Sequence, residues 1–488
     1  MRTIGNNPQL SRQTQAVASG AITGGKPVLV NTNGTVSQIT GATLGLGSEV
    51  DYTTTGVYSA ATHDSTNNRL VIAYSDWADS GKGKARVSTV SDISISLGSA
   101  VLFEDAQTGY ISTTFDSNSN RVVISYSDAG NGNYLTAIVG TVDPSDNSIS
   151  FGTAVVVQSS SVRKNSIAFD SSNNKVVLSF RKYTTGYHCM AVVGTVNPSN
   201  NSISFGTIAT VTAGATTENS IVFDSNSNKV VISYDESSAR VRVGTVSGTN
   251  ISFGTAVEFR AAGVRSAMSS AFDSTNNKVL IAYVETSSAV SGGIGKCAVG
   301  TVSGTNISFG SASSVGGVVF DGNVADEASI DYNSANQKIV IGYQDSGDSS
   351  KGKYVIGTVS GTSISFTGET FFNNGSSANI GSTYDSTSER IVFVFKDGAN
   401  SDNGTAVALR LPSTNITAES YIGIAEDTVA TGQSVTVNTK GAVDENQTSL
   451  TAGQTYFVQT TGTLGTSADD PSVVAGTAVT ATKLIVKG

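Results

Sequence analysis

One pattern of alternating hydrophobic and polar positions recurs along most of the chain. Its clearest copy runs from Ser220 to Phe259 and reads SIVFDSNSNKVVISYDESSARVRVGTVSGTNISFGTAVEF. Alternation with a period of two is typical of β-strands, and turn-forming Asp, Asn, Ser and Gly residues separate the apolar stretches. The pattern predicts four strands: A ends in an aromatic residue followed by Asp-Ser, B is KVVISY, C is VRVGTV and D is ISFGTAV.

This pattern occurs seven times, and the residue that closes strand A marks each copy. The seven positions are His63, Phe115, Phe169, Phe223, Phe272, Tyr332 and Tyr384. A period near fifty residues with four strands per copy is typical of β-propeller blades, whereas a solenoid would need distinct capping repeats at its ends. The sequence therefore predicts an all-β protein with a seven-bladed β-propeller.

The last copy lacks a strand D of its own. It supplies strands A, B and C and then reaches Pro412 without a stretch like ISFGTAV. The missing pattern stands upstream of the first copy, where Gly34 to Val50 reads GTVSQITGATLGLGSEV. We expect the segment near Ala42 to Val50 to form the outer strand of blade seven, because such an N-terminal exchanged strand removes an open sheet edge.

A shorter pattern flanks the repeats on both sides. It covers Ala21 to Val36, Thr428 to Val443 and Ser449 to Leu464. We expect these copies to form one small β-barrel or sandwich domain from both termini. The predicted division is an N-terminal arm at 1–19, a split terminal β-domain for attachment or oligomerisation at 20–40 and 413–488, and the propeller at 41–412. The polar arm is expected to become ordered against a partner, in a homo-oligomer such as a trimer.

Composition excludes several classes of partner. Charged residues make up only 14% of the chain and the net charge is −9, which argues against nucleic-acid binding because phosphate contacts need clustered Lys and Arg. No apolar run is long enough to span a membrane, and the first residues, MRTIGNNPQLSRQTQAV, lack the apolar segment of a secretory signal. Cys189 and Cys297 fall in different repeats and are expected to be free thiols.

Acidic residues recur two positions after the aromatic residue of strand B. They are Asp76, Asp128, Glu236, Glu285, Asp345 and Asp397, and the third copy has Lys182 instead. A ring of carboxylates could bind cations or sugar hydroxyls. Repetition in nearly every copy is more typical of turn caps, so we expect solvated caps. Nothing marks two of these acids as the unlike pair of a glycosidase.

No catalytic or metal-binding pattern stands out. The D-S-x-x-N-K turns lack the glycine and tryptophan of the Asp boxes found in sialidase-like propellers, and no hydrolase, zinc, phosphate-loop or calcium motif occurs. His63 stands where other copies have Phe or Tyr and is expected to be a packing substitution. His188 lies beside Cys189, but two further ligands at suitable spacing are absent. We therefore expect a protein without catalytic residues, metal or cofactor.

The links between strands B and C vary strongly between copies, whereas the A–B and C–D links are nearly constant. Variation on one face of a repeat scaffold is typical of a binding face. Exposed aromatic rings there can stack on sugars or anchor protein interfaces, although each could instead pack over the rim of its own blade. The candidate ligand-binding residues are Trp77, Tyr134, Tyr183 and Tyr187 on B–C links and Tyr110 on a D–A link.

Three stretches resemble structural proteins of tailed bacteriophages. Residues 115–142 and 192–207 look like propeller repeats in such proteins, and residues 449–488 are similar to the ends of such virion proteins. The resemblance implies a virion component, either a tail or head fibre or a capsid decoration protein. It also implies other virion proteins as partners and a host surface glycan or receptor as a ligand, and it supplies no catalytic residues.

The sequence thus predicts a non-enzymatic bacteriophage virion surface protein whose propeller serves binding or display. Two alternatives stay open: a virion-associated carbohydrate-active enzyme and a bacterial surface lectin. Tail and capsid positions on the particle are equally compatible with the sequence.

Overall fold

The computed structural model describes residues 12–183, 186–261, 263–286, 293–310, 317–417, 419–469 and 471–487. This part of the chain is all-β, as predicted: its strands pair in antiparallel sheets, and only short 3-10 segments interrupt them. No helix in the described ranges is long and apolar enough to cross a membrane. The chain divides into a repeat region, Leu46–Arg410, and a terminal region, Met1–Gly45 with Leu411–Gly488.

The first three copies of the long pattern each form four antiparallel strands in chain order. The first is β7 (Gly56–Asp64), β8 (Arg69–Asp76), β9 (Lys82–Ser91) and β10 (Ser94–Leu97); the second is β11 (Val101–Asp116), β12 (Arg121–Asp128), β13 (Tyr134–Asp143) and β14 (Ser148–Phe151); the third is β15 (Val155–Asp170), β16 (Lys175–Lys182), β17 (Cys189–Asn197) and β18 (Ser202–Phe205).

The next three copies follow the same order, although the first strand is split in two of them. The fourth is β19 (Ala209–Thr212), β20 (Asn219–Asp224), β21 (Lys229–Asp235), β22 (Ala239–Ser247) and β23 (Asn250–Phe253); the fifth is β24 (Val257–Arg260), β25 (Val264–Asp273), β26 (Lys278–Thr286), β27 (Gly293–Ser303) and β28 (Asn306–Phe309); the sixth is β29 (Val318–Asn333), β30 (Lys338–Asp345), β31 (Lys351–Ser360) and β32 (Ser363–Phe366).

The seventh copy takes its outer strands from upstream of the first. It contains β33 (Thr370–Asp385), β34 (Arg390–Asp397) and β35 (Asn403–Arg410), and β35 neighbours β5 (Gly45–Leu46) and β6 (Val50–Thr53). Elsewhere the third strand of a copy pairs with its own fourth strand and with the start of the next first strand, as β9 does with β10 and β11. Residues 45–53 occupy those two places beside β35. The paired segment begins later than predicted, because Ala42 pairs with Ser413 of the terminal region instead.

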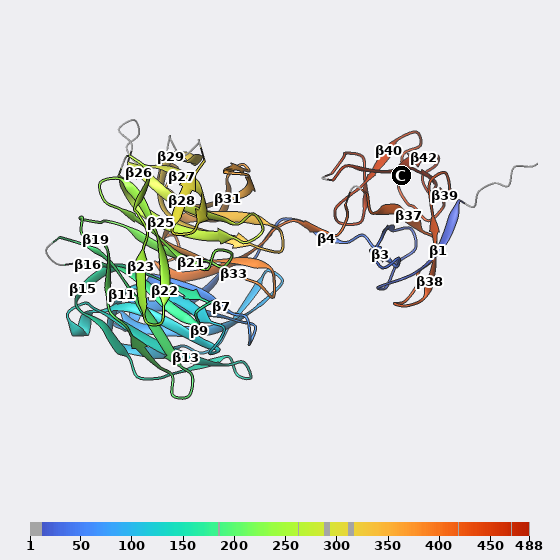
Figure 1. Ribbon diagram of the computed structural model, residues 1–488. Helices are drawn as coiled ribbons and strands as arrows, with labels where there is room; N and C mark the ends of the chain where they lie inside the picture. Colours follow the sequence, from blue (N-terminus) through green and yellow to red (C-terminus); the bar gives the residue numbers. More distant parts are fainter. Residues whose placement is uncertain are drawn as a thin grey trace, which may run out of the picture. The chain divides into compact units, whose positions relative to one another are not determined.

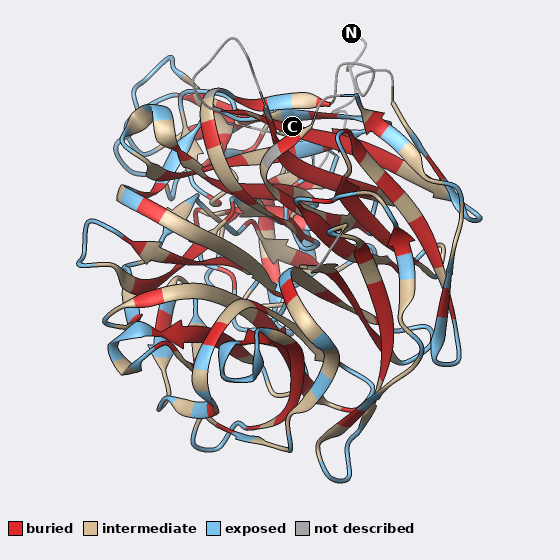
Figure 2. Cartoon of the chain, turned by 90° about the vertical axis from the view of Figure 1, so that its left-hand side faces the viewer, coloured by how far each residue is buried: buried red, intermediate tan, exposed pale blue. Residues whose placement is uncertain are grey.

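The hydrophobic core of the repeat region lies between consecutive copies. The second strand of each copy is buried along almost its whole length (Figure 2). In the second copy, its side chains pack against both the first and the third copies. One core cluster joins Leu70 and Tyr74 of the first copy to Val392 of the seventh. Because full burial of one such aliphatic side chain is worth about 1.5–3 kcal/mol, these interfaces between copies are a main source of stability.

An aromatic ring covers a glycine at several of these interfaces. A Cβ atom at the glycine would approach the ring to 2.3–2.5 Å, so only glycine fits there. The ring and glycine pairs are Phe103 with Gly83, Phe320 with Gly295, Phe372 with Gly352 and Tyr52 with Gly404. The last pair makes the same contact between the two ends of the repeat region.

The turn between the first and second strands explains the repeated Asp-Ser motif. In the first copy, Asp64 Oδ1 accepts hydrogen bonds from the backbone N–H groups of Thr66 and Asn67, at 3.1 and 2.9 Å. Asn68 then adopts a φ of 54°, a left-handed conformation that Asn tolerates better than most residues. Equivalent carboxylate bonds occur at Asp116, Asp170, Asp224, Asp273 and Asp385.

His63 is buried, as expected of a packing substitution, but it also forms an ion-pair contact. Its Nε2 lies 3.0 Å from Asp385 Oδ1, and its Nδ1 is 3.3 Å from the backbone nitrogen of Ser386. Burial opposes ionisation of Asp385, but the hydrogen bonds from His63 and Ser388 outweigh it and lower the pKa of this carboxyl. His63 thus ties the first copy to the seventh.

The terminal region contains two five-stranded sheets. One has the order β1 (Gln13–Val17), β38 (Ser434–Asn438), β37 (Tyr421–Ala425), β2 (Pro27–Val30) and β3 (Val36–Gln38). The other has the order β39 (Val443–Asp444), β43 (Leu484–Val486), β42 (Val473–Ala478), β40 (Thr455–Val458) and β41 (Leu464–Gly465). A small ladder pairs β36 (Ser413–Thr414) with β4 (Gly41–Ala42). Blue N-terminal strands thus lie among red C-terminal ones in this region (Figure 1).

The three copies of the shorter pattern share the same turns. Each copy has glycine in a left-handed conformation just before one strand and again just after it, with φ between 75° and 85°. These glycines are Gly25 and Gly34, Gly432 and Gly441, and Gly453 and Gly462. One core cluster includes Leu29 and Ile424 from the first sheet and Val458 and Leu484 from the second, so the two sheets share a core.

Part of the expected N-terminal arm is a strand of the terminal region. Residues 13–17 form β1, which pairs with β38 of the same chain, and the Gln15 side chain donates a hydrogen bond to Thr436 Oγ1 at 2.8 Å. The expectation that this stretch needs a partner chain for order is therefore wrong for β1. Backbone pairing along an existing sheet edge orders this mostly polar strand, and Ala16 packs against a core cluster of the terminal region. Residues 1–11 of the predicted arm lie outside the described residues.

Candidate functional site

The first strands of all seven copies line one cavity of about 310 Å³. Each of these strands contacts the first strand of the next copy, and β33 of the seventh contacts β7 of the first. Small and polar residues dominate the lining, including Ser112, Ser166, Ser220, Ser269 and Ser382. The inward-facing positions of the first strands thus form a polar interior rather than a hydrophobic core.

A bulge interrupts six of these first strands at corresponding positions. The bulge residues are not glycines, yet each has a left-handed φ between 43° and 53°. They are Tyr58, Tyr110, Lys164, Ala267, Glu327 and Asn379. The register with the second strand shifts at each of them. Bulges redirect side chains, and strained residues of this kind cluster at ligand sites.

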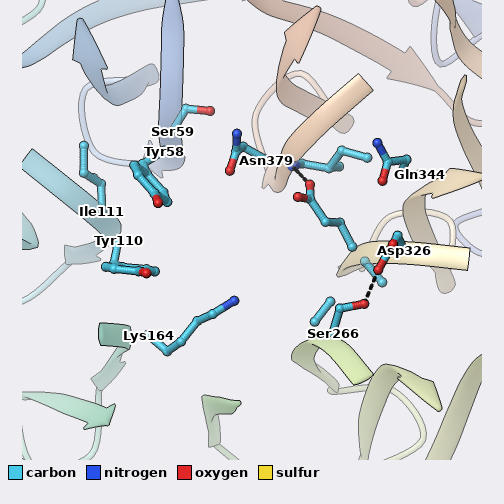
Figure 3. Close-up of a pocket in the computed structure, with 13 residues that line it drawn as sticks. Tyr58, Ser59, Tyr110, Ile111, Lys164, Ser266, Asp326, Gln344 and Asn379 are labelled. Atoms are coloured by element: carbon cyan, nitrogen blue, oxygen red, sulfur yellow. Dashed lines mark hydrogen bonds between the residues drawn. The ribbon is translucent and has the colours of Figure 1, made fainter. Parts of the chain in front are cut away.

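All six bulge residues line a second cavity of about 370 Å³ that adjoins the first. We call this cavity, with its lining residues, the mouth. Figure 3 shows the rings of Tyr58 and Tyr110 on one side, Asp326 and Gln344 opposite them, and Asn379 between the two sides. The two tyrosine rings are 5.0 Å apart and tilted by 42°. The Lys164 side chain extends into the space between the two sides.

Charges in the mouth are held in place by neighbouring groups. Lys164 Nζ lies 2.9 Å from Glu218 Oε1, and Glu218 is buried. Glu327 Oε2 accepts a hydrogen bond from the backbone nitrogen of Ile380 at 3.1 Å, while Asp326 accepts one from Ser266. Burial raises the pKa of both Glu218 and Glu327, against the opposing effects of Lys164 and of backbone hydrogen bonds.

The composition of the mouth favours a ligand rich in hydroxyl groups. Two tyrosine rings offer apolar faces with polar edges, and the carboxylates, amides and ammonium group offer both acceptors and donors. Sites of this kind recognise polar small molecules by a few placed hydrogen bonds around an apolar platform. The left-handed bulges position these groups on strands rather than on loops, so little ordering is needed when a ligand binds.

The structure brings Tyr110 into the mouth but within strand β11 rather than on a link. Its partner, Tyr58, was not predicted from the sequence. The sequence does relate the two residues. Tyr58 and Tyr110 each stand five positions before the aromatic residue that closes the first strand of their copy, which is His63 in one and Phe115 in the other. The sequence did not show that a bulge turns this position toward the cavity.

The other predicted aromatic residues lie elsewhere. Tyr183 and Tyr187 form a pair with ring centroids 5.2 Å apart. Trp77, which is 45% exposed, begins a single 3-10 turn (Trp77–Asp79) between β8 and β9. Tyr134 is the first residue of β13, and its ring lies against Gly132.

Five of the six repeated acids are buried rather than solvated, and the sixth, Glu236, is half-buried. Asp76, Asp345 and Asp397 do cap turns, since each accepts a backbone hydrogen bond within its own link. Lys353 Nζ lies 2.6 Å from Asp345, and Arg260 and Lys296 lie 2.5 and 2.6 Å from Glu285. The correction has a physical reason at Asp76, Glu285 and Asp345: a lysine of the following strand lies beside each acid and compensates its charge. Removal of one partner from such a buried pair would leave an uncompensated charge, which costs far more than the loss of an exposed cap.

Both cysteines are buried and free, as predicted. Burial raises the pKa of the Cys189 and Cys297 thiols to about 12. Among the described residues, no group of three or more His, Cys, Asp or Glu side chains could hold a metal ion.

We expect the bulge at Ala267 to be strained. A left-handed conformation costs an L-residue about 1–2 kcal/mol, and glycine avoids this cost at a smaller loss of chain entropy. Ala267→Gly should therefore raise the free energy of unfolding by up to about 1 kcal/mol, whereas Ala267→Val should lower it. Chemical denaturation would measure both. Ala271→Gly in the same strand is the control and should destabilise the protein; equal signs for the two glycine variants would contradict the strain.

No model of a known protein family matches the sequence, and no curated protein is significantly similar to it.

Proposed function

We propose that this chain is a non-enzymatic binding protein in which a seven-bladed β-propeller presents the mouth to a glycan. The observation that carries the proposal is the convergence of six bulge residues, from six copies, on one cavity, two of them tyrosines whose rings form a pair. Sugars bind through stacking on aromatic faces and through hydrogen bonds to hydroxyl groups, and the mouth offers both.

Three observations support a propeller closed by an exchanged strand. The first strands contact one another in chain order and back to the first copy, and β6 pairs with β35 as β11 pairs with β9. The Tyr52 and Gly404 pair repeats a contact found between consecutive copies. Closure of this kind removes the open edges of the first and last copies.

The surface of a bacteriophage particle is the setting that we propose for this protein. The support is the resemblance of the repeats and of residues 449–488 to virion structural proteins. In this proposal the terminal region, as a small β-barrel or sandwich domain, attaches the protein to other virion proteins in a homo-oligomer such as a trimer. The propeller then serves as a tail or head fibre module or a capsid decoration that meets a host surface glycan.

Glycan binding tests the site. A glycan array screened with the full chain should identify ligands, and Tyr58→Ala and Tyr110→Ala should each weaken binding of the best ligand about tenfold or more, because loss of one stacked ring costs about 1–2 kcal/mol. Trp77→Ala, which changes an exposed aromatic outside the mouth, is the matched control. An affinity unchanged in both tyrosine variants, with the fold intact, would reject the mouth as the site.

The same ligands distinguish binding from catalysis. Prolonged incubation with the wild-type protein should release no new reducing ends. Release that is lost in Glu327→Gln would favour a carbohydrate-active enzyme instead.

A further inference from the structure

The third copy carries a cluster of cations and aromatic rings outside the mouth. Arg163 in β15 is the direct cross-strand partner of Arg181 in β16, and Lys182 follows at the point where six other copies have an acid. Tyr183 and Tyr187 complete the group, which we call the arginine cluster. A local reversal of charge in a chain of net charge −9 is specific to this copy.

The tyrosine rings fix the guanidinium groups. The Arg163 guanidinium carbon lies 3.9 Å from the centre of the Tyr183 ring, and that of Arg181 lies 5.0 Å from the Tyr187 ring. A guanidinium stacked on an aromatic face keeps its in-plane N–H groups available for hydrogen bonds. The rings therefore orient two donor groups without occupying their donors.

Backbone hydrogen bonds hold the rings in turn. Tyr183 N donates to the carbonyl of Ser161 at 2.7 Å, and the carbonyl of Tyr187 accepts from Thr216 N at 3.0 Å and from its hydroxyl at 2.8 Å. These bonds connect the link to β15 and to the segment before β20. The cluster is thus built on anchored chain segments on both sides.

Within the described residues, the cations of the cluster, Arg163, Arg181 and Lys182, form no ion pair, although Arg181 acts on the Glu218 carboxylate electrostatically. The Nε of Arg181 is buried and makes no hydrogen bond within the same part of the chain. The nearby acid, Glu218, is already paired with Lys164. Unneutralised, oriented guanidinium groups are the usual receptor for a carboxylate or sulfate.

We propose that the arginine cluster binds an acidic group, a carboxylate or a sulfate ester, on a glycan whose neutral part occupies the mouth. Arg163 and Lys164 are consecutive residues, and the bulge at Lys164 sends one side chain to the cluster and the other into the mouth. One extended polymer can therefore reach both. That the ligand is a glycan rests on the proposed function, whereas the recognition of an anion rests on the cluster alone.

The test compares polymers that differ in charge. Polygalacturonate carries carboxylates, dextran sulfate carries sulfate esters and dextran is neutral; each is titrated into the full chain by calorimetry. The wild-type protein should bind an acidic polymer at least tenfold more tightly than dextran, and the polymer that binds better identifies the anion. Binding should weaken with added salt.

Variants assign this preference to the cluster. Arg163→Gln, at an exposed position, should lower the affinity for the acidic polymer about tenfold, and the double variant with Arg181→Gln should lower it further. Arg163→Lys keeps the charge but loses the planar pair of donors, so it should also bind more weakly than wild type. Arg240→Gln, an arginine of the fourth copy paired with Glu258, is the control and should bind like wild type.

Three results would overturn the inference. One is equal affinity for acidic and neutral polymers, and another is an unchanged affinity in Arg163→Gln. The third is tighter, Arg163-dependent binding to phosphatidylglycerol vesicles or single-stranded DNA, which would assign the cluster to a lipid or nucleic-acid phosphate. Acid-selective, Arg163-dependent binding that Tyr58→Ala leaves unchanged would reject the mouth but keep the anion site.

Discussion

Replacing Tyr52 by alanine is expected to lower the free energy of unfolding of the repeat region by about 3–5 kcal/mol, the usual cost of truncating a buried aromatic residue. Tyr52 is 1% exposed, and its ring lies 5.1 Å from that of Tyr74. It also covers Gly404, so its loss opens the contact between the two ends of the repeat region. Chemical denaturation followed by tryptophan fluorescence would measure the change, because Trp77 lies in the first copy.

Phe103→Ala is the matched control for this substitution. Phe103 covers Gly83 in the same way, but its contact lies between two consecutive copies. The two variants should lose similar amounts of stability if residues 50–53 are paired with β35 in solution. A loss below about 0.5 kcal/mol for Tyr52→Ala, as at an ordinary surface position, would show that the ends are not joined.

The second large effect is expected at Asp331, in the first strand of the sixth copy. Asp331 accepts a hydrogen bond from Ser382 of the seventh copy. Burial raises the pKa of this carboxyl to about 7, against the opposing hydrogen bonds from Ser382 and from the backbone of Tyr384. An unfolded Asp has a pKa near 4, so the folded protein retains a proton that the unfolded chain releases.

Stability should therefore fall as the pH rises from about 4 to about 7, and the penalty should stay constant above pH 7. Each unit of pKa corresponds to about 1.4 kcal/mol, and the partial exposure of the residue reduces the total to about 1–3 kcal/mol. Asp331→Asn should remove this penalty, so it should raise the free energy of unfolding at pH 8 and leave it unchanged at pH 4.

The difference between wild type and Asp331→Asn, measured by urea denaturation across this pH range, isolates the one carboxyl from all other titrating groups. A difference that does not vary with pH would mean that Asp331 ionises normally in the folded protein. Asp331 stands directly before the aromatic residue that closes the first strand of its copy. It is the only acid at this position, because the other copies have Thr62, Thr114, Ala168, Val222, Ala271 and Thr383.

The sequence alone determined the all-β class, the seven copies, the free cysteines and the pairing of a segment near residue 50 with the last copy. These features depend on local alternation, on turn residues and on a period that recurs within the chain. The Asp-Ser turns are an example, because the capping carboxylate and the amides that it binds are two or three residues apart. Interactions of such short range leave a direct trace in the sequence.

Only the tertiary structure decided where the chemistry gathers. Tyr58 and Tyr110 meet at 5.0 Å although they belong to different copies, and a bulge, not the regular alternation, directs both toward the mouth. Three of the repeated acids, Asp76, Glu285 and Asp345, were expected in solvent but are buried, and each pairs with a lysine of the following strand. The physical reason is common to these cases. A one-residue register shift reverses the side of the strand that a residue faces, and the hydrophobic pattern does not record which partner is then met across a cavity or between copies.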